Sequence, residues 1–336
     1  MKFKLLAVTA MLCVTAPSFA APITFSFIYN DAAGTGFNDP VLGAQRKAAL
    51  EEAGDYWSGL LNASYAGETI NISASFSAVS TSTTPLSASQ QTNQYINAGL
   101  DNKGFINVSY SAPLAEYVAG RNLNGSSADY NLVFSPNVPE YLGLDGNPPA
   151  GQFDFETYGI RSIARTLGVV SRIDRALVTT DGSQQGGFST QFNPSTGALI
   201  NAPSIYDTFL VDGSGTSLLA MTDAQRVTAV TTGNLYWNGA NAIAANGGVR
   251  PKLYAPALNA DGTINGNSIV YLEESAGTLL SFQSPHTGIA MGADAVTLGE
   301  LKDLGWSVAA VPEPSTYAML LAGLGMIGFV ARRRCS

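Results

Sequence analysis

The chain is poor in the residues that enzymes use for metal binding and nucleophilic catalysis. Its one histidine is His286, and its two cysteines, Cys13 and Cys335, lie near the two ends. A catalytic zinc site needs three protein ligands, usually histidines, and a serine triad needs a histidine beside its nucleophile. No G-x-S-x-G nucleophile elbow is present. The sequence therefore argues against both chemistries, and it predicts that His286 is a surface or hydrogen-bonded residue.

Two arginines four residues apart, Arg161 and Arg165, are the most unusual charged residues of the body. On a helix they share one face, where like charges repel by roughly a few tenths of a kcal/mol. A guanidinium only donates hydrogen bonds and cannot bind a metal. If the two side chains line a cleft, they predict a site for a carboxylate, a phosphate or an acidic chain end. The alternative is that they pair internally with Glu156, Glu273 or Glu274, or reach solvent.

The three glutamates suggest another chemistry. Two carboxylates about 5–10 Å apart across an open groove can perform acid and base catalysis on a polysaccharide. Glu156, Glu273 and Glu274 are the candidates for such a pair. Two Asp- and Gly-rich loops, at 212–215 and 261–268, lack the full run of calcium ligands that ends in an acidic residue. They are interpreted as ordinary turns.

The elements that must position these residues are readable from the hydrophobic periodicity. Alternation and β-rich composition predict strands at 23–31, 68–79 and 129–137, and helical spacing predicts helices at 43–61, 113–125 and 153–171. Residues 80–94 are of low complexity and are predicted to form a surface loop. The half after Thr180 is rich in Gly and Asn and contains one clear helix, at 221–234, which Thr222 opens. The order predicts an α+β domain over 21–310, a twisted sheet with packed helices and an irregular C-terminal subdomain.

The first twenty residues are typical of a secretory signal peptide. Lys2 and Lys4 precede an apolar run from Leu5 to Val14, and Ala20 stands before the predicted cut. The run is too short to span a bilayer. Residues 1–20 are therefore expected to direct the chain to the Sec export machinery.

The last residues, 311–336, have three parts in a fixed order. An apolar run at 317–331 lies between a PEP tripeptide and an arginine cluster, which are Pro312, Glu313, Pro314 and Arg332, Arg333, Arg334. The fifteen apolar residues rise about 22 Å as a helix, against a bilayer core of about 30 Å. They predict a thin transmembrane segment with the arginines on the cytoplasmic side.

The arrangement resembles the PEP-CTERM sorting tail of Gram-negative bacteria. The resemblance implies that an exosortase in the inner membrane removes the tail and that the protein reaches the cell surface or the exterior. An ordinary single-span anchor is the alternative.

The body between these ends is acidic and free of cysteine. It carries 12 basic and 24 acidic residues once the five basic residues and the one acidic residue of the ends are set aside. Such a charge excludes nucleic-acid binding through phosphate contacts. Without cysteine in the body, no disulfide is expected there.

Several blocks of the body resemble a family of secreted bacterial zincin metalloproteases. They are FDFETYGI, IYDTFLVDGSG, AMTDAQRVTAVTTGNLYWNGANAIAANGG, VRPKLYAP and VTLGELKDLGW, and they cover most of 150–306. The resemblance implies a zincin-like fold whose third helix carries H-E-x-x-H-x-x-G, with two histidines on zinc and the glutamate as general base. The corresponding helix here spans about 154–170.

The functional positions of that motif are all replaced. Aligned on Leu167-Gly168, Arg161 and Arg165 stand at the two histidines and Ser162 at the glutamate, while Tyr271 stands at a further histidine. The resemblance therefore implies a non-catalytic relative that uses no cofactor. We expect it to bind or scaffold at the surface or in the extracellular matrix, with an exopolysaccharide or matrix partner. The alternative is an active hydrolase, on a peptide or a polysaccharide, that uses the carboxylates in place of zinc.

Overall fold

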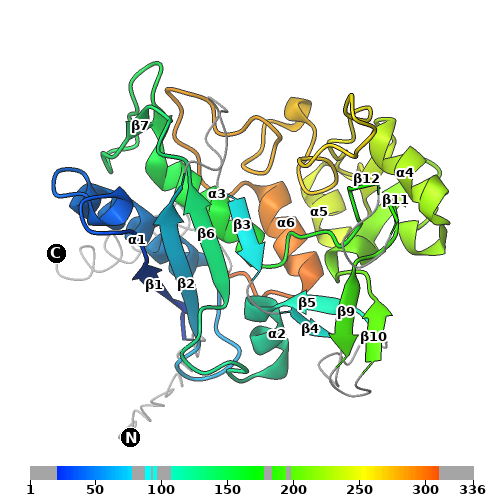
Figure 1. Ribbon diagram of the computed structural model, residues 1–336, viewed down its shortest axis with the longest axis horizontal. Coiled ribbons are helices and arrows are strands. Elements are labelled where there is room, and N and C mark those ends of the chain that lie inside the picture. Colours follow the sequence, from blue (N-terminus) through cyan, green and yellow to red (C-terminus); the bar gives the residue numbers. More distant parts are fainter. Residues whose placement is uncertain are drawn as a thin grey trace, which may run out of the picture.

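The main sheet of the protein contains three parallel strands and one antiparallel edge strand. The structure is a computed structural model that describes residues 21–77, 88–91, 94–96, 107–177, 184–193 and 198–309. The sheet order is β1 (Thr24–Tyr29), β2 (Thr69–Phe76), β6 (Tyr130–Phe134) and β3 (Ala88–Gln91) (Figure 1). The first three strands run parallel, and β3 pairs with β6 in the opposite direction. The three predicted strands are confirmed. The loop predicted for 80–94 is wrong at β3, because the edge of β6 supplies hydrogen-bond partners that the local sequence does not reveal.

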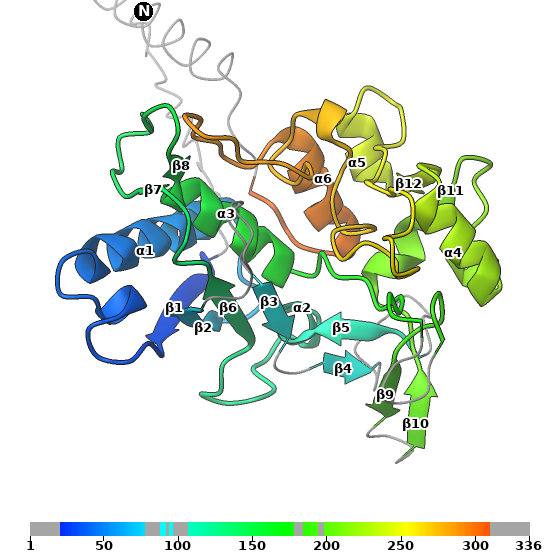
Figure 2. The ribbon, with the colours of Figure 1, turned by 45° about the horizontal axis from the view of Figure 1, so that its top comes forward.

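Two helices, α1 (Gly43–Leu60) and α3 (Phe155–Thr166), lie side by side against the sheet (Figure 2). The indole of Trp57 on α1 donates to the Ile160 carbonyl of α3 at 2.9 Å. A Cβ at Gly159 would lie 2.7 Å from the Ala53 side chain, so only glycine permits this crossing. The helices predicted at 43–61 and 153–171 are confirmed, with α3 shorter at both ends.

The ends of α3 are fixed by specific contacts. Asp154 caps the helix, since its carboxylate accepts from the Thr157 N–H and hydroxyl. After the helix, Gly168 takes φ of 117°, a left-handed conformation that favours glycine. The Trp306 indole then donates to the Leu167 carbonyl at 2.7 Å. These contacts therefore fix the position of the residues on α3.

The C-terminal half contains more helix than the sequence predicts. The predicted helix is α4 (Asp223–Thr231), and Thr222 opens it with a complete capping box. Two others, α5 (Ala240–Ala245) and α6 (Ala295–Leu304), pack on each other. The prediction of one helix is wrong because α5 has only six residues and α6 contains Gly299. That glycine allows the contact, since its Cβ would lie 2.6 Å from the Ala242 Cα.

Short elements complete the described chain. The remaining helix, α2 (Ala112–Ala119), confirms the one predicted at 113–125. The two-stranded pairs are β4 (Gln94–Ile96) with β5 (Ser109–Ser111), β7 (Glu140–Tyr141) with β8 (Phe153–Asp154), β9 (Thr190–Asn193) with β10 (Ala198–Asn201), and β11 (Leu210–Asp212) with β12 (Leu235–Trp237). Helices and small sheets in this mixture confirm the α+β class.

The predicted signal peptide and the predicted span at 317–331 lie outside the described residues. Within the described ranges, no helix is both long and apolar enough to cross a bilayer.

Candidate functional site

The inner face of α3 brings together three of the four positions singled out from the sequence. Arg161, Arg165 and Tyr271 are in contact, although more than a hundred residues separate the tyrosine from the arginines. The Arg161 guanidinium carbon lies 4.3 Å from the centre of the Tyr271 ring, and that of Arg165 lies 5.0 Å from it. The fourth residue, Ser162, is buried on the same helix.

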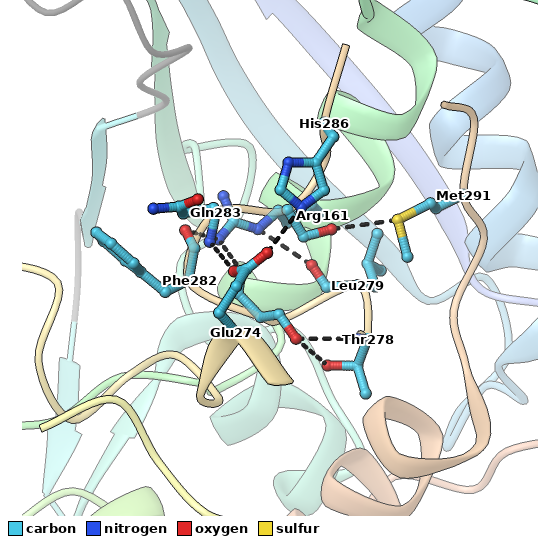
Figure 3. A network of polar contacts seen from close by, with 10 residues as sticks. Arg161, Glu274, Thr278, Leu279, Phe282, Gln283, His286 and Met291 are labelled. Atoms are coloured by element: carbon cyan, nitrogen blue, oxygen red, sulfur yellow. Dashed lines mark hydrogen bonds and ion pairs between the residues drawn. The ribbon is translucent and has the colours of Figure 1, made fainter. Parts of the chain in front are cut away.

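Arg161 is enclosed by backbone carbonyls. Its Nε donates to the Leu279 carbonyl at 3.1 Å, and its Nη2 donates to Ser281 at 2.8 Å and to Phe282 at 3.3 Å (Figure 3). We call these three carbonyls the carbonyl cradle. Only 8% of Arg161 is exposed, so burial lowers the pKa of its guanidinium from the usual value. Arg161 is neither paired with Glu156, Glu273 or Glu274 nor directed to solvent, as the predicted alternative had it, because backbone carbonyls are its partners.

The loop at 278–293, which contains the carbonyl cradle, is tied to α1 and α3 near its C-terminal end. The Met291 N–H donates to the Thr157 hydroxyl at 2.8 Å, and the Ala293 N–H donates to the Tyr56 hydroxyl at 2.7 Å. The Ser284 hydroxyl lies 3.2 Å from the Met291 sulfur (Figure 3). The segment therefore covers the helix face where the sequence resemblance places a metal.

His286 lies on the outside of this segment, as predicted for a hydrogen-bonded surface residue. Its Nε2 lies 2.7 Å from the Glu274 carboxylate, and about half of its side chain is exposed (Figure 3). The other oxygen of Glu274 accepts from the Gln283 N–H. His286 is therefore part of a loop contact and not of a catalytic triad.

Arg165 and Arg175 have few protein partners. Arg165 donates to the Tyr271 hydroxyl at 2.8 Å, and Arg175 donates to the Ser268 carbonyl at 3.2 Å. The buried Nε of each has no hydrogen-bond partner among the described residues. The pKa of the Arg175 guanidinium is lowered, first by burial and then by the charge of Arg165. We call these two residues the Arg165–Arg175 pair.

Tyr271 responds to the charges around it. Burial opposes ionisation of its phenol, but the Arg165 and Arg161 guanidiniums outweigh burial and lower the pKa of Tyr271 below its usual value of 10.0. Its hydroxyl oxygen accepts from Arg165, and no acceptor for its own proton is found among the described residues. The phenol is therefore polarised toward the phenolate.

The nearest acidic groups do not neutralise the pair by direct contact. No carboxylate of the described residues lies within ion-pair distance of Arg161, Arg165 or Arg175. Asp207 attracts Arg175 from further away, but its Oδ2 already accepts from Arg172 and Ser204. Burial also raises the pKa of Asp207. The region therefore keeps an excess of positive charge.

The candidate carboxylates of the alternative hydrolase are dispersed among other partners. Glu273 pairs with Lys252 at 2.9 Å, and Glu274 pairs with His286. Glu156 lies in the first turn of α3, and burial, with Asp154 and Glu52, raises its pKa. None of the three forms an ion pair with Arg161 or Arg165, so the pairing that the sequence offered as an alternative is wrong. The reason is that Glu273 and Glu274 lie at a turn directed toward Lys252 and His286.

The two Asp- and Gly-rich loops at 212–215 and 261–268 form turns, and the tryptophan of the NLYWNG segment lies in the core. Asp212 accepts from Ser214 and Thr216, and Asp261 accepts from Thr263. Trp237 is fully buried. Within the described ranges, no three His, Cys, Asp or Glu side chains gather as a metal site would require.

Of two hollows among the described residues, one lies beside α3 and the other lies in the C-terminal half. The one beside the start of α3 is lined by Phe155, Tyr158 and Glu140, and its volume of about 20 Å³ admits one water rather than a substrate side chain. An open groove of about 590 Å³ lies in the C-terminal half, lined by Tyr236, Asn238 and Arg250 among others.

The sequence reasoning missed Arg175. A signal was present, because four of the body's arginines, Arg161, Arg165, Arg172 and Arg175, fall within fifteen residues of an acidic chain. Arg175 lies beyond the end of α3. Only the folded structure shows that it is near enough for the charge of Arg165 to lower its pKa.

Comparison with known protein families gives a match at the C-terminal tail. The model of the PEP-CTERM protein-sorting motif matches residues 310–334, the tail that contains Pro312, Glu313, Pro314 and the arginine cluster. No curated protein and no solved structure matches the chain. The tail thus carries a PEP-CTERM sorting motif, which indicates an exported bacterial protein that an exosortase directs to the cell surface.

Proposed function

We propose that the body of this exported protein is a metalloprotease-like domain without zinc-dependent catalysis, and that it acts as a binding or scaffold protein at the cell surface or in the extracellular matrix. The carbonyl cradle around Arg161 carries the proposal. A guanidinium with three carbonyl partners occupies the face of α3 on which the family would hold its metal. A cation on that face repels zinc, and the segment above it covers the place where a substrate would lie.

Two features of the fold support the zincin-like part of the proposal. A twisted sheet with α1 and α3 packed on it precedes an irregular C-terminal half, which is the architecture that the resemblance implies. In addition, positions 161, 165 and 271, which the resemblance assigns to one metal, meet in space. An exopolysaccharide or another matrix component is the proposed partner, reached through exosortase processing.

The test is the zinc content of the purified chain, measured by elemental analysis after dialysis against trace zinc, together with casein and polysaccharide hydrolysis. We expect less than one zinc in ten chains and no hydrolysis above the blank. A matched variant with Arg161→His, Ser162→Glu, Arg165→His and Tyr271→His restores the family's residues and serves as the positive control for zinc binding. One zinc per wild-type chain would overturn the proposal.

The alternative hydrolase is tested in the same assays. Glu156 is the candidate acid, because its raised pKa suits proton donation. Activity that disappears in Glu156→Gln would establish the hydrolase and displace the scaffold.

A further inference from the structure

The Arg165–Arg175 pair combines two features that are costly together. Arg165 donates to the Tyr271 hydroxyl and Arg175 donates to the carbonyl of Ser268, three residues earlier on the same segment, and no carboxylate of the described residues pairs with either cation. Buried charge without a partner is unfavourable, and proteins normally supply the opposite charge or a ligand. Among the buried arginines of the described chain, Arg46 pairs with Glu140, Arg226 pairs with Asp223, and Arg161 donates to the carbonyl cradle.

The donors of the pair remain available. Arg165 uses one of its five N–H groups on Tyr271, and Arg175 uses one on Ser268. Both side chains are partly exposed, so a small group in solution can reach them, while the Nε of each is buried and unpartnered. A two-oxygen anion suits such donors, because a guanidinium fork binds a carboxylate or phosphate edge through two parallel hydrogen bonds.

The backbone beside the pair is strained. Ile269 is buried and has φ of 79°, a conformation that β-branched residues rarely adopt. Its carbonyl accepts from the Tyr206 hydroxyl at 2.9 Å, and the preceding carbonyl, of Ser268, accepts from Arg175. Strain of this kind gathers at binding and catalytic sites. Here it places the acceptor that orients Arg175.

We propose that Arg165 and Arg175 form a binding site for an oxyanion, the carboxylate or phosphate group of a ligand. Arg161 does not take part, because its Nε and Nη2 donate to the carbonyl cradle and the residue is almost fully buried. This proposal rests on the proposed function and specifies the class of ligand that the binding protein would take. An acidic sugar would supply a carboxylate, and a phosphorylated molecule would supply a phosphate.

The test is thermal unfolding and calorimetric titration of the purified chain with acetate and with inorganic phosphate, at ionic strength held constant with chloride. We expect a rise in Tm that saturates with one of the two anions, and the more effective anion identifies the source. Arg165→Gln and Arg175→Gln should each weaken binding at least tenfold. Arg250→Gln, which removes a cation from the open groove, is the matched control and should bind as the wild type does.

If the glutamine variants fail to fold, Arg175→Lys keeps the charge but loses the fork, and it should still bind several-fold more weakly. Binding by Arg175→Lys equal to the wild type would overturn the site, as would loss of binding in Arg250→Gln alone. A wild-type chain that responds to neither anion, but shows tyrosinate absorbance at neutral pH, would also overturn it, since Tyr271 would then supply the counter-charge. Zinc content is a separate readout: a zinc-containing chain that binds the anion contradicts only the proposed function.

Discussion

Arg161 and Arg165 lie one turn apart on α3 and contact the same tyrosine, yet their surroundings differ. Arg161 is almost fully buried and donates to three carbonyls, whereas Arg165 donates to one hydroxyl and keeps an unpartnered Nε. Tyr271 contacts both arginines: its ring packs against the Arg161 guanidinium, and its hydroxyl oxygen accepts from Arg165. The comparison teaches that a like-charged pair on one helix face can divide into a structural residue and a residue with free donors.

The division has a physical cause in the segments that face the helix. The 279–282 segment presents backbone oxygens, which bind a cation without requiring a charge. Arg165 instead faces a phenol and another arginine. The first arrangement stabilises the fold, and the second leaves the cation in need of an anion.

The largest effect is expected for Arg161→Ala. The change leaves the carbonyls of the cradle without donors and creates a void, so the free energy of unfolding should fall by about 3 kcal/mol. Urea denaturation of the purified chain measures it. Arg250→Ala, a change at the open groove, is the control and should lie within about 0.5 kcal/mol of the wild type. A loss below about 1 kcal/mol for Arg161→Ala would show that the cradle is not structural.

A smaller effect is expected for Tyr271→Phe at neutral pH. The ring that packs under Arg161 remains, but Arg165 loses its only described acceptor, so stability should fall by about 1–2 kcal/mol. Arg161→Ala should therefore be the more destabilising of the two. The reverse order would contradict the division of roles along α3.

The same variant tests the ionisation of Tyr271. Because the folded pKa lies below the unfolded value of 10.0, the phenolate contributes stability that is present above pH 10 and is lost as the pH falls through the folded pKa. The difference in stability between the wild type and Tyr271→Phe should therefore grow as the pH rises toward 10. The comparison must be made as a difference, since burial raises the pKa of Tyr158 and Tyr206 in the same region. A difference that is flat with pH would show that the arginines do not lower this pKa.

The smallest effect is expected for His286→Ala. Its contact with Glu274 lies on the exposed side of the segment that forms the cradle, and exposed ion pairs contribute about 0–1 kcal/mol. We expect a change below about 0.5 kcal/mol in urea denaturation. A larger loss would mean that the segment is held from outside rather than by Arg161, and Glu274→Gln would then show the same loss.

The export features and most of the regular elements can be predicted from the amino-acid sequence alone. The PEP tripeptide, the apolar run and the arginine cluster are contiguous, so their order can be read without a fold, and the sorting-motif match agrees with it. The strands β1, β2 and β6 and the helices α1, α2, α3 and α4 follow from periodicity and caps, which act over a few residues. The position of Arg161 and Arg165 on one helix face is local information of the same kind.

The contacts of these arginines depend on long-range packing and could not be predicted from the sequence. The strand β3 depends on the edge of β6, and α6 depends on the close approach of Gly299 to α5, both long-range contacts. The partners of Arg161 are carbonyls, which every residue carries, so no side-chain pattern in the sequence could identify them. Arg175 was missed for the same reason, because its nearness to Arg165 arises from the path of the chain after α3. The local sequence determines on which face of its helix or strand a side chain lies, and packing between distant segments determines which residues it contacts.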